Sequence, residues 1–219
     1  MTNDEMAPSN PFVSRCVRPG AIPYLFQSES NLDTLITSLR DHRWRGQIVG
    51  LHGSGKSTLV ESLMAPLRRA GRKPVQYRFS STRWQSSPAG RLSATHAEPA
   101  GYCLFPRGDD PVWDRNTQVI VDGFEQLYSL QRMSLYARCL YQGAGLLVTT
   151  HRRTLTLPLL YHTHVDLTTA WDVVQRLFEE QAANPISNQE VSDCLQSHHG
   201  NMREMLFALY DLYETRRYG

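Results

Sequence analysis

One stretch of the chain, GLHGSGKST at residues 50–58, has residue types and a spacing suited to holding phosphate. It fits the pattern G-x-x-x-x-G-K-[ST], and it lies between a strand-like segment and a helix-like one, as that pattern requires. Glycines let backbone N–H groups turn toward phosphate oxygens, while the lysine contacts the β- and γ-phosphates and the serine binds Mg²⁺. The alternative is a chance glycine-rich turn. The residues expected to bind a nucleotide are Gly50, Gly53, Ser54, Gly55, Lys56, Ser57 and Thr58.

A second candidate is VIVDGFEQL at residues 119–127, in which an apolar segment ends in Asp122. An aspartate at the carboxyl end of a buried strand can hold Mg²⁺ beside a phosphate-binding loop. The next acid, Glu125, comes three residues later and could orient a water for hydrolysis. An aspartate that only ends a strand at a turn is the alternative. We expect a magnesium site at Ser57 and Asp122, with Glu125 as the candidate hydrolytic acid.

A sheet must position these residues, because strand patterns alternate with helical ones through the middle of the chain. The expected strands are 46–50, 74–79, 118–122, 146–150 and 157–167, and the expected helices beside them are 30–44, 57–71 and 124–145. Such alternation indicates a parallel sheet covered by helices on both faces, hence an α/β fold. Only helical patterns follow, at 170–183, 188–199 and 201–217.

The patterns predict three regions. Residues 1–44 form an N-terminal arm and helix, residues 45–168 form a nucleotide-binding core, and residues 169–219 form a small all-helical unit. Within the core, residues 80–116 are rich in Ser, Gly, Pro and Arg and too long for a simple connection. Loops of this length are usually functional or disordered.

With these motifs, the chain resembles the P-loop NTPases, with residues 50–57 as Walker A and residues 119–122 as Walker B. The further strand LLVTT, which ends in Thr149 and Thr150, resembles the γ-phosphate sensor of the additional-strand ATPases, the group that includes AAA+-like and STAND-like proteins. Hydroxyls that merely end a strand are the alternative. The resemblance implies a three-layer α/β P-loop core with a parallel sheet, binding ATP and Mg²⁺, followed by a short helical lid.

The segment HHGNMREMLF resembles the start of the second sensor helix of that group, with Arg203 as the matching residue. An arginine in the first turn of a packed helix is the alternative. The chain departs from the AAA+ pattern at Gly123, where those proteins usually carry glutamate, and is closer there to the STAND-like pattern. No arginine finger is recognisable, and the open candidates are Arg107, Arg115, Arg152 and Arg153.

The composition is that of an ordinary globular protein, with 41% hydrophobic and 20% charged residues among 219. Four scattered cysteines favour neither a disulfide framework nor a zinc site and fit a reducing, cytoplasmic setting. The histidine pairs 162/164 and 198/199 lack a third ligand at metal-binding spacing. No apolar run approaches the roughly 20 residues of a membrane span, so we expect neither secretion nor membrane insertion.

The net charge of +2 is too small to imply a nucleic-acid partner, but the charge is uneven. Residues 66–108 carry eight lysines and arginines against one acid, Glu98, and aromatic residues are interleaved with them. Such a segment could contact nucleic acid through phosphates and stacked bases. A solvated basic loop is the commoner explanation.

Three functions stay open, and an ATPase or ATP-driven switch acting on a protein or other macromolecular partner is favoured. There Arg203 would close the helical lid over the nucleotide, and Glu125 or Thr149 would orient water. A nucleotide or small-molecule kinase is the second, although the helical tail has no place in that plan. The third is a non-hydrolysing module that assembles on nucleic acid. A GTPase is disfavoured because Asn-Lys-x-Asp and Asp-x-x-Gly motifs are absent.

Overall fold

The computed structural model describes residues 10–27, 30–80, 83–87, 112–154, 157–179 and 184–218, except for the side chains of residues 80 and 83–87. The chain divides into two compact units, which are described separately. The sheet unit comprises Ser28–Gly50 and Ser62–His162, and the helical unit comprises Met1–Gln27, Leu51–Glu61 and Thr163–Gly219. Most of the glycine-rich loop therefore groups with the C-terminal helices.

The sheet unit is built on one six-stranded sheet in the order β3-β2-β4-β5-β1-β6. Its strands are β1 Arg45–Val49, β2 Lys73–Ser80, β3 Arg83–Ser87, β4 Thr117–Asp122, β5 Gly145–Thr150 and β6 Leu159–His162. All neighbouring pairs are parallel except β2 and β3, which are antiparallel. The parallel α/β architecture expected from the sequence is confirmed. Strand β5 lies between β1 and β4, so three strands that end in candidate site residues are adjacent.

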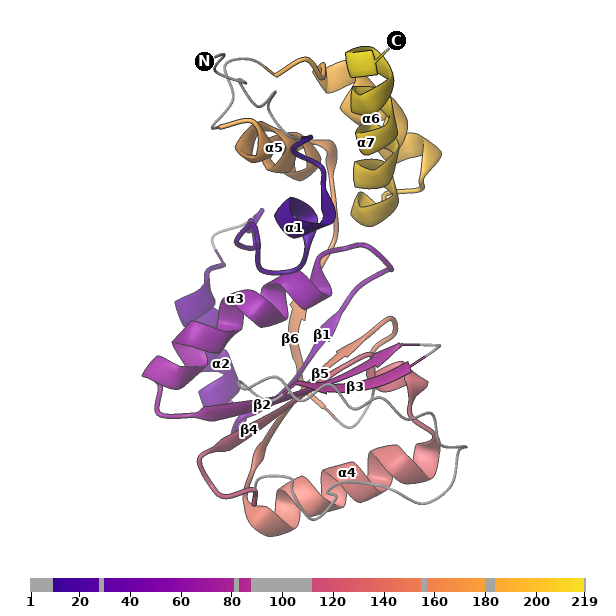
Figure 1. Ribbon diagram of the computed structural model, residues 1–219. Helices are drawn as coiled ribbons and strands as arrows, with labels where there is room; N and C mark the ends of the chain where they lie inside the picture. The colour runs from indigo at the N-terminus through magenta and orange to yellow at the C-terminus, as the bar shows by residue number, and fades with distance from the viewer. Residues whose placement is uncertain are drawn as a thin grey trace, which may run out of the picture. The chain divides into compact units, whose positions relative to one another are not determined.

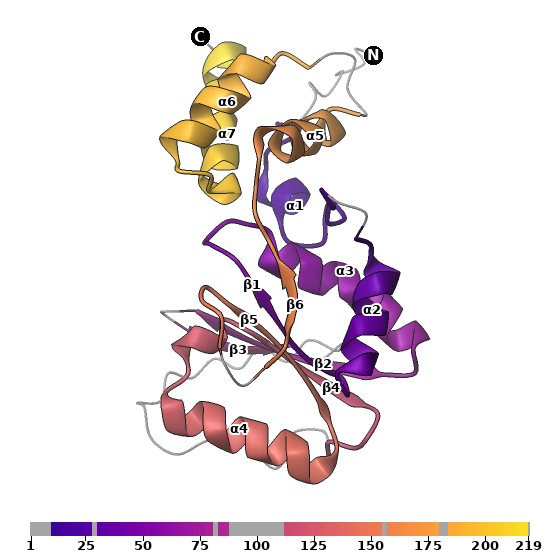
Figure 2. The same ribbon diagram turned by 180° about the vertical axis from the view of Figure 1, so that it is seen from behind.

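Helices cover both faces of this sheet (Figures 1 and 2). Helix α2, Leu32–Asp41, and residues 62–69 of α3, Lys56–Arg69, lie on one face, while α4, Ser129–Gln142, lies on the other. Strands β4 and β5 are buried along their whole length, as expected of central strands that are covered on both sides.

The predicted helix over residues 124–145 is interrupted at its start. Gly123 has a φ of +87°, a 3-10 helix covers Phe124–Gln126, and Leu127 is extended before α4 begins. Phe124 and Leu127 are both buried in the apolar cluster beneath α4, which also holds Trp113 and Tyr77. Residues three apart also share one face of a continuous helix, so apolar spacing alone does not reveal the break that the backbone makes at Gly123 and Leu127.

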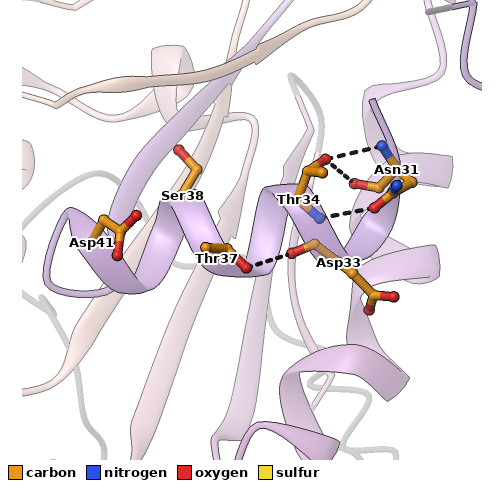
Figure 3. Close-up of a pocket in the computed structure, with 6 residues that line it drawn as sticks. All are labelled: Asn31, Asp33, Thr34, Thr37, Ser38 and Asp41. Carbon is orange, nitrogen blue, oxygen red and sulfur yellow. Dashed lines mark hydrogen bonds between the residues drawn. The ribbon is translucent and has the colours of Figure 1, made fainter. Parts of the chain in front are cut away.

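The outward side of α2 is polar and forms a shallow pocket lined by Asn31, Asp33, Thr34, Thr37, Ser38 and Asp41 (Figure 3). Its hydroxyls are used within the helix. Asn31 Oδ1 accepts the Thr34 N–H at 2.9 Å while Thr34 Oγ1 accepts the Asn31 N–H at 3.0 Å, which is a reciprocal N-terminal cap. Thr37 Oγ1 donates to Asp33 O at 3.0 Å. Through these hydrogen bonds, Asn31, Asp33, Thr34 and Thr37 stabilise the helix.

The helical unit contains α1, Ser14–Val17, α5, Leu167–Leu177, α6, Asn188–Ser197, and α7, Met202–Tyr218. Its core is apolar and includes Phe12 from the N-terminal arm, whose ring packs edge-on against Phe178 and Tyr213. Asn10 fixes the same arm, because its Nδ2 donates to Glu214 Oε1 at 2.6 Å. The arm thus belongs to the helical core. Within the described ranges, no helix has the length and apolar character needed to span a membrane.

Candidate functional site

The glycine-rich loop runs from Gly50 to Gly55, between the end of β1 and the start of α3. Gly53 and Gly55 have φ angles of +69° and +86°, which glycine adopts without strain. The Leu59 N–H donates to Gly55 O at 2.9 Å, so helical hydrogen bonding begins inside the loop. An α-helix leaves its first N–H groups without intrahelical acceptors, and such a terminus attracts anions.

Two side chains of the helical unit lie against this loop. A Cβ atom at Gly53 would lie 1.8 Å from Asn201 Oδ1, and one at Gly55 would lie 3.1 Å from the Tyr24 ring. Asn201 also caps α7, because its Oδ1 accepts the Arg203 N–H at 3.1 Å. The start of α7 is therefore beside the loop, with Arg203 exposed two residues after the contact. Glycine is required at Gly53 both by its φ and by the space that Asn201 occupies.

The polar side chains of the loop are held from within the helical unit. Lys56 is 9% exposed, and its ammonium donates to Leu51 O at 2.7 Å. The buried hydroxyls of Ser54 and Thr163 lie 2.6 Å apart. Ser57 is half-buried at the first turn of α3, as is its neighbour Thr58. A lysine charge buried beside backbone amides is a fixed electropositive feature, which suits a site for phosphate.

In the sheet unit, Asp122 lies at the carboxyl edge of the sheet beside Thr149, the sensor candidate. Thr149 Oγ1 donates to Asp122 Oδ1 at 2.6 Å and accepts the Gly123 N–H at 3.0 Å. Strands β1, β5 and β4 are adjacent and parallel, so their carboxyl ends meet at this edge. The Gly50 N–H donates to Thr150 O at 3.1 Å, which places the first glycine of the loop at the same edge.

Arg78, at the end of β2, places a positive charge beside the same carboxylate. Its Nε lies 3.4 Å from Asp122 Oδ2, and the two residues face each other in the register of β2 and β4. Asp122 therefore has a hydroxyl on one oxygen and a guanidinium near the other. A carboxylate oxygen is a ligand that Mg²⁺ prefers, whereas the guanidinium of Arg78 competes with any metal ion for the same carboxylate.

Gly123 has no room for a side chain. Besides its positive φ, a Cβ atom here would lie 2.6 Å from the backbone oxygen of Phe79 on β2. Such a contact is shorter than van der Waals packing allows, and the atom involved is backbone that cannot rotate away. The glycine that departs from the AAA+ pattern is thus fixed by the close approach of a neighbouring strand.

Glu125 is tied to a residue that sequence reasoning missed. His151, directly after β5, has its Nε2 2.8 Å from Glu125 Oε1 and its Nδ1 3.2 Å from Gly50 O. Both side chains are about three-quarters buried, with exposures of 23% and 26%. The imidazole thus joins the acid after β4 to the start of the glycine-rich loop.

The remaining sequence candidates fall in different places. Arg115 precedes β4, so the length of that strand, about 20 Å, separates it from Asp122. Arg152 and Arg153 are exposed and follow β5 at the carboxyl edge. Arg107 and most of the insertion 80–116, including the basic part of 66–108 beyond β2, lie outside the described residues.

Arg78, His151, Tyr24 and Asn201 extend the set predicted from the sequence. For Arg78 a signal existed, since it ends a strand pattern, but its neighbour across the sheet was unknown. In the part of the chain that the structure describes, no three His, Cys, Asp or Glu side chains are grouped closely enough to hold a metal ion by themselves. No protein-family model matches the chain, and no curated protein matches it.

Proposed function

We propose that this protein binds ATP with Mg²⁺ through a P-loop and either hydrolyses it slowly or uses it as a conformational switch on a macromolecular partner. One observation carries the proposal: the carboxyl edge of the parallel sheet gathers the start of the glycine-rich loop and the Asp122–Thr149 pair. Ligands of open α/β sheets bind at this edge. An additional strand, β5, separates β1 from β4, which supports the resemblance to the additional-strand ATPases.

Each side chain then has the role that the resemblance to the P-loop NTPases implies. Lys56 and the N–H groups at the start of α3 bind phosphate oxygens, and Ser57 and Asp122 hold the metal ion. Thr149 fixes the carboxylate of Asp122 through the 2.6 Å hydrogen bond. Bound Mg²⁺ would neutralise charge on the phosphate oxygens. Arg203, exposed at the first turn of α7, is the candidate that contacts nucleotide from the helical unit.

Calorimetric titration of Mg²⁺ and ATP tests the binding claim. Lys56→Ala is expected to weaken binding at least about tenfold, because a charge-assisted contact to phosphate is lost. Lys73→Ala is the matched control, since Lys73 is exposed and paired with Asp114 before β4, at the opposite edge. Equal ATP affinity of Lys56→Ala and the wild-type protein would contradict the assignment of the loop.

Phosphate release separates the possible outcomes of binding. Purified protein is incubated with Mg²⁺ and ATP, alone and with DNA. Release without any added acceptor supports an ATPase, and stimulation by DNA adds a nucleic-acid partner. Binding without release in either reaction identifies a silent switch or a kinase that lacks its acceptor.

A further inference from the structure

We propose that His151 is a positioning residue that restrains the carboxylate of Glu125 and keeps hydrolysis low until the restraint is released. The inference rests on the proposed function, because Glu125 is the candidate hydrolytic acid of that site. Its starting point is the pair of contacts that the imidazole makes, 2.8 Å to Glu125 Oε1 and 3.2 Å to Gly50 O.

Both ring nitrogens of His151 face oxygen atoms. A carbonyl oxygen can only accept a hydrogen bond, so Nδ1 carries the hydrogen toward Gly50. A neutral ring has one N–H, and its Nε2 would then turn a lone pair toward the Glu125 carboxylate. An imidazolium donates to both oxygens and carries the charge opposite to that of the carboxylate. The imidazole therefore bridges the Glu125 carboxylate and the Gly50 carbonyl at the start of the glycine-rich loop.

This pairing makes Glu125 a poor base toward water. One carboxylate oxygen is occupied by the imidazole at 2.8 Å and is not available to draw a proton from water. The other oxygen, Oε2, is buried and has no hydrogen-bond partner in the described part of the chain. The carboxylate is therefore held in an arrangement that offers neither oxygen to a solvent water, and it must leave His151 to act.

The backbone around Glu125 is fixed separately, so the restraint acts on the side chain. Arg132 of α4 donates from Nη2 to Glu125 O at 2.9 Å and from Nε to Leu127 O at 2.8 Å. Its guanidinium also lies over the Phe124 ring at 5.4 Å. Because these contacts hold the main chain, release of His151 lets the carboxylate change rotamer without moving the sheet. A movement of the glycine-rich loop that displaces the Gly50 carbonyl would free His151 and so release Glu125.

The bridge itself is tested without nucleotide. ¹⁵N-edited NMR of the histidine rings is recorded for the wild-type protein, Glu125→Gln and the control His162→Gln, which alters an exposed histidine at the end of β6. We expect both His151 nitrogens to carry hydrogens, and the Nε2–H signal to move strongly upfield or vanish by exchange in Glu125→Gln only. A His151 ring spectrum that is the same in the wild-type protein and Glu125→Gln overturns the bridge.

The restraint is tested by separating turnover from affinity. His151→Ala should raise kcat by about tenfold or more, within the range that one general base contributes, while ATP affinity stays within about twofold. His151→Ala combined with Glu125→Gln should lose the gain, and His162→Gln should behave as wild type. An unchanged or lowered kcat in His151→Ala overturns the restraint. Failure of the wild-type protein to bind ATP would instead overturn the proposed function, and the NMR result decides the bridge independently.

Discussion

Thr149 Oγ1 lies 2.6 Å from Asp122 Oδ1 and 3.0 Å from the backbone nitrogen of Gly123. One hydroxyl thus fixes both the carboxylate and the peptide that follows it, and it joins the ends of two central strands. The residue expected to sense a phosphate therefore has a structural task that can be measured without any ligand.

Replacement of Thr149 by valine keeps the shape of the side chain and removes the hydroxyl. The Asp122 carboxylate then loses a donor and the Gly123 N–H loses this acceptor in a buried place, so the free energy of unfolding should fall by about 1–3 kcal/mol. Urea denaturation of Thr149→Val and Thr149→Ser measures the change. Thr149→Ser keeps the hydroxyl and should retain most of the stability, so equal losses in both variants would argue against the hydrogen bonds.

Gly123→Ala tests the close approach of Phe79. The matched control is Gly71→Ala, because Gly71 has a similar φ of +80° but nothing within 4 Å of an added Cβ. The control should lose only about 1 kcal/mol for the unfavourable backbone conformation. Gly123→Ala should lose clearly more, since a backbone oxygen lies 2.6 Å from the new atom. Denaturation of both variants side by side gives the difference, and equal losses would mean that the strand can move aside.

Gly53→Ala tests the contact between the glycine-rich loop and the start of α7. An alanine there meets Asn201 Oδ1 at 1.8 Å, so either the loop or the cap must shift. We expect lower thermal stability and ATP affinity reduced at least about fivefold, since ordered N–H groups hold the phosphate. Asn201→Ala removes the nearest atoms and should restore part of both losses in the double variant. Gly200→Ala, at a φ of +78° with open space around it, is the control for backbone strain.

The pairing of Glu190 with Arg216 predicts a pH dependence in the helical unit. The hydrogen bond from Arg216, with those from Ser187, lowers the pKa of Glu190 from 4.5 to about 2. Because the pKa in the folded state lies below its ordinary value, the contribution to stability is fully present above about pH 4.5 and is lost as the pH falls toward about 2. Glu190→Gln should therefore lower the melting temperature at pH 7 and converge with the wild-type protein near pH 2. A difference in melting temperature between Glu190→Gln and the wild-type protein that stays the same from pH 7 to about pH 2 would contradict the pairing.

Much of the sheet unit could be predicted, because its strands can be recognised in the sequence as apolar runs that end in polar residues. Asp122 and Thr149 were each expected at the end of a strand, and the two side chains are in contact there. Arg78 and His151 could not be assigned in the same way. The contact of Arg78 depends on which strands are neighbours, and that of His151 depends on how its imidazole ring is oriented. Neither can be predicted from the spacing of residues along the chain. Helical spacing was misleading after Gly123, where a positive φ and a 3-10 turn precede the α-helix while Phe124 and Leu127 keep the burial that a helix would also give them.

The backbone at Gly123 also limits what mutation could make of this protein. A glutamate side chain at position 123, directly after Asp122, would clash with a backbone oxygen of β2. The positive φ at this position also disfavours any residue with a side chain. An acid at position 123 thus requires β2 to shift away from it. Position 151 offers a simpler change, because a single substitution there alters the partner of Glu125, an acid already present.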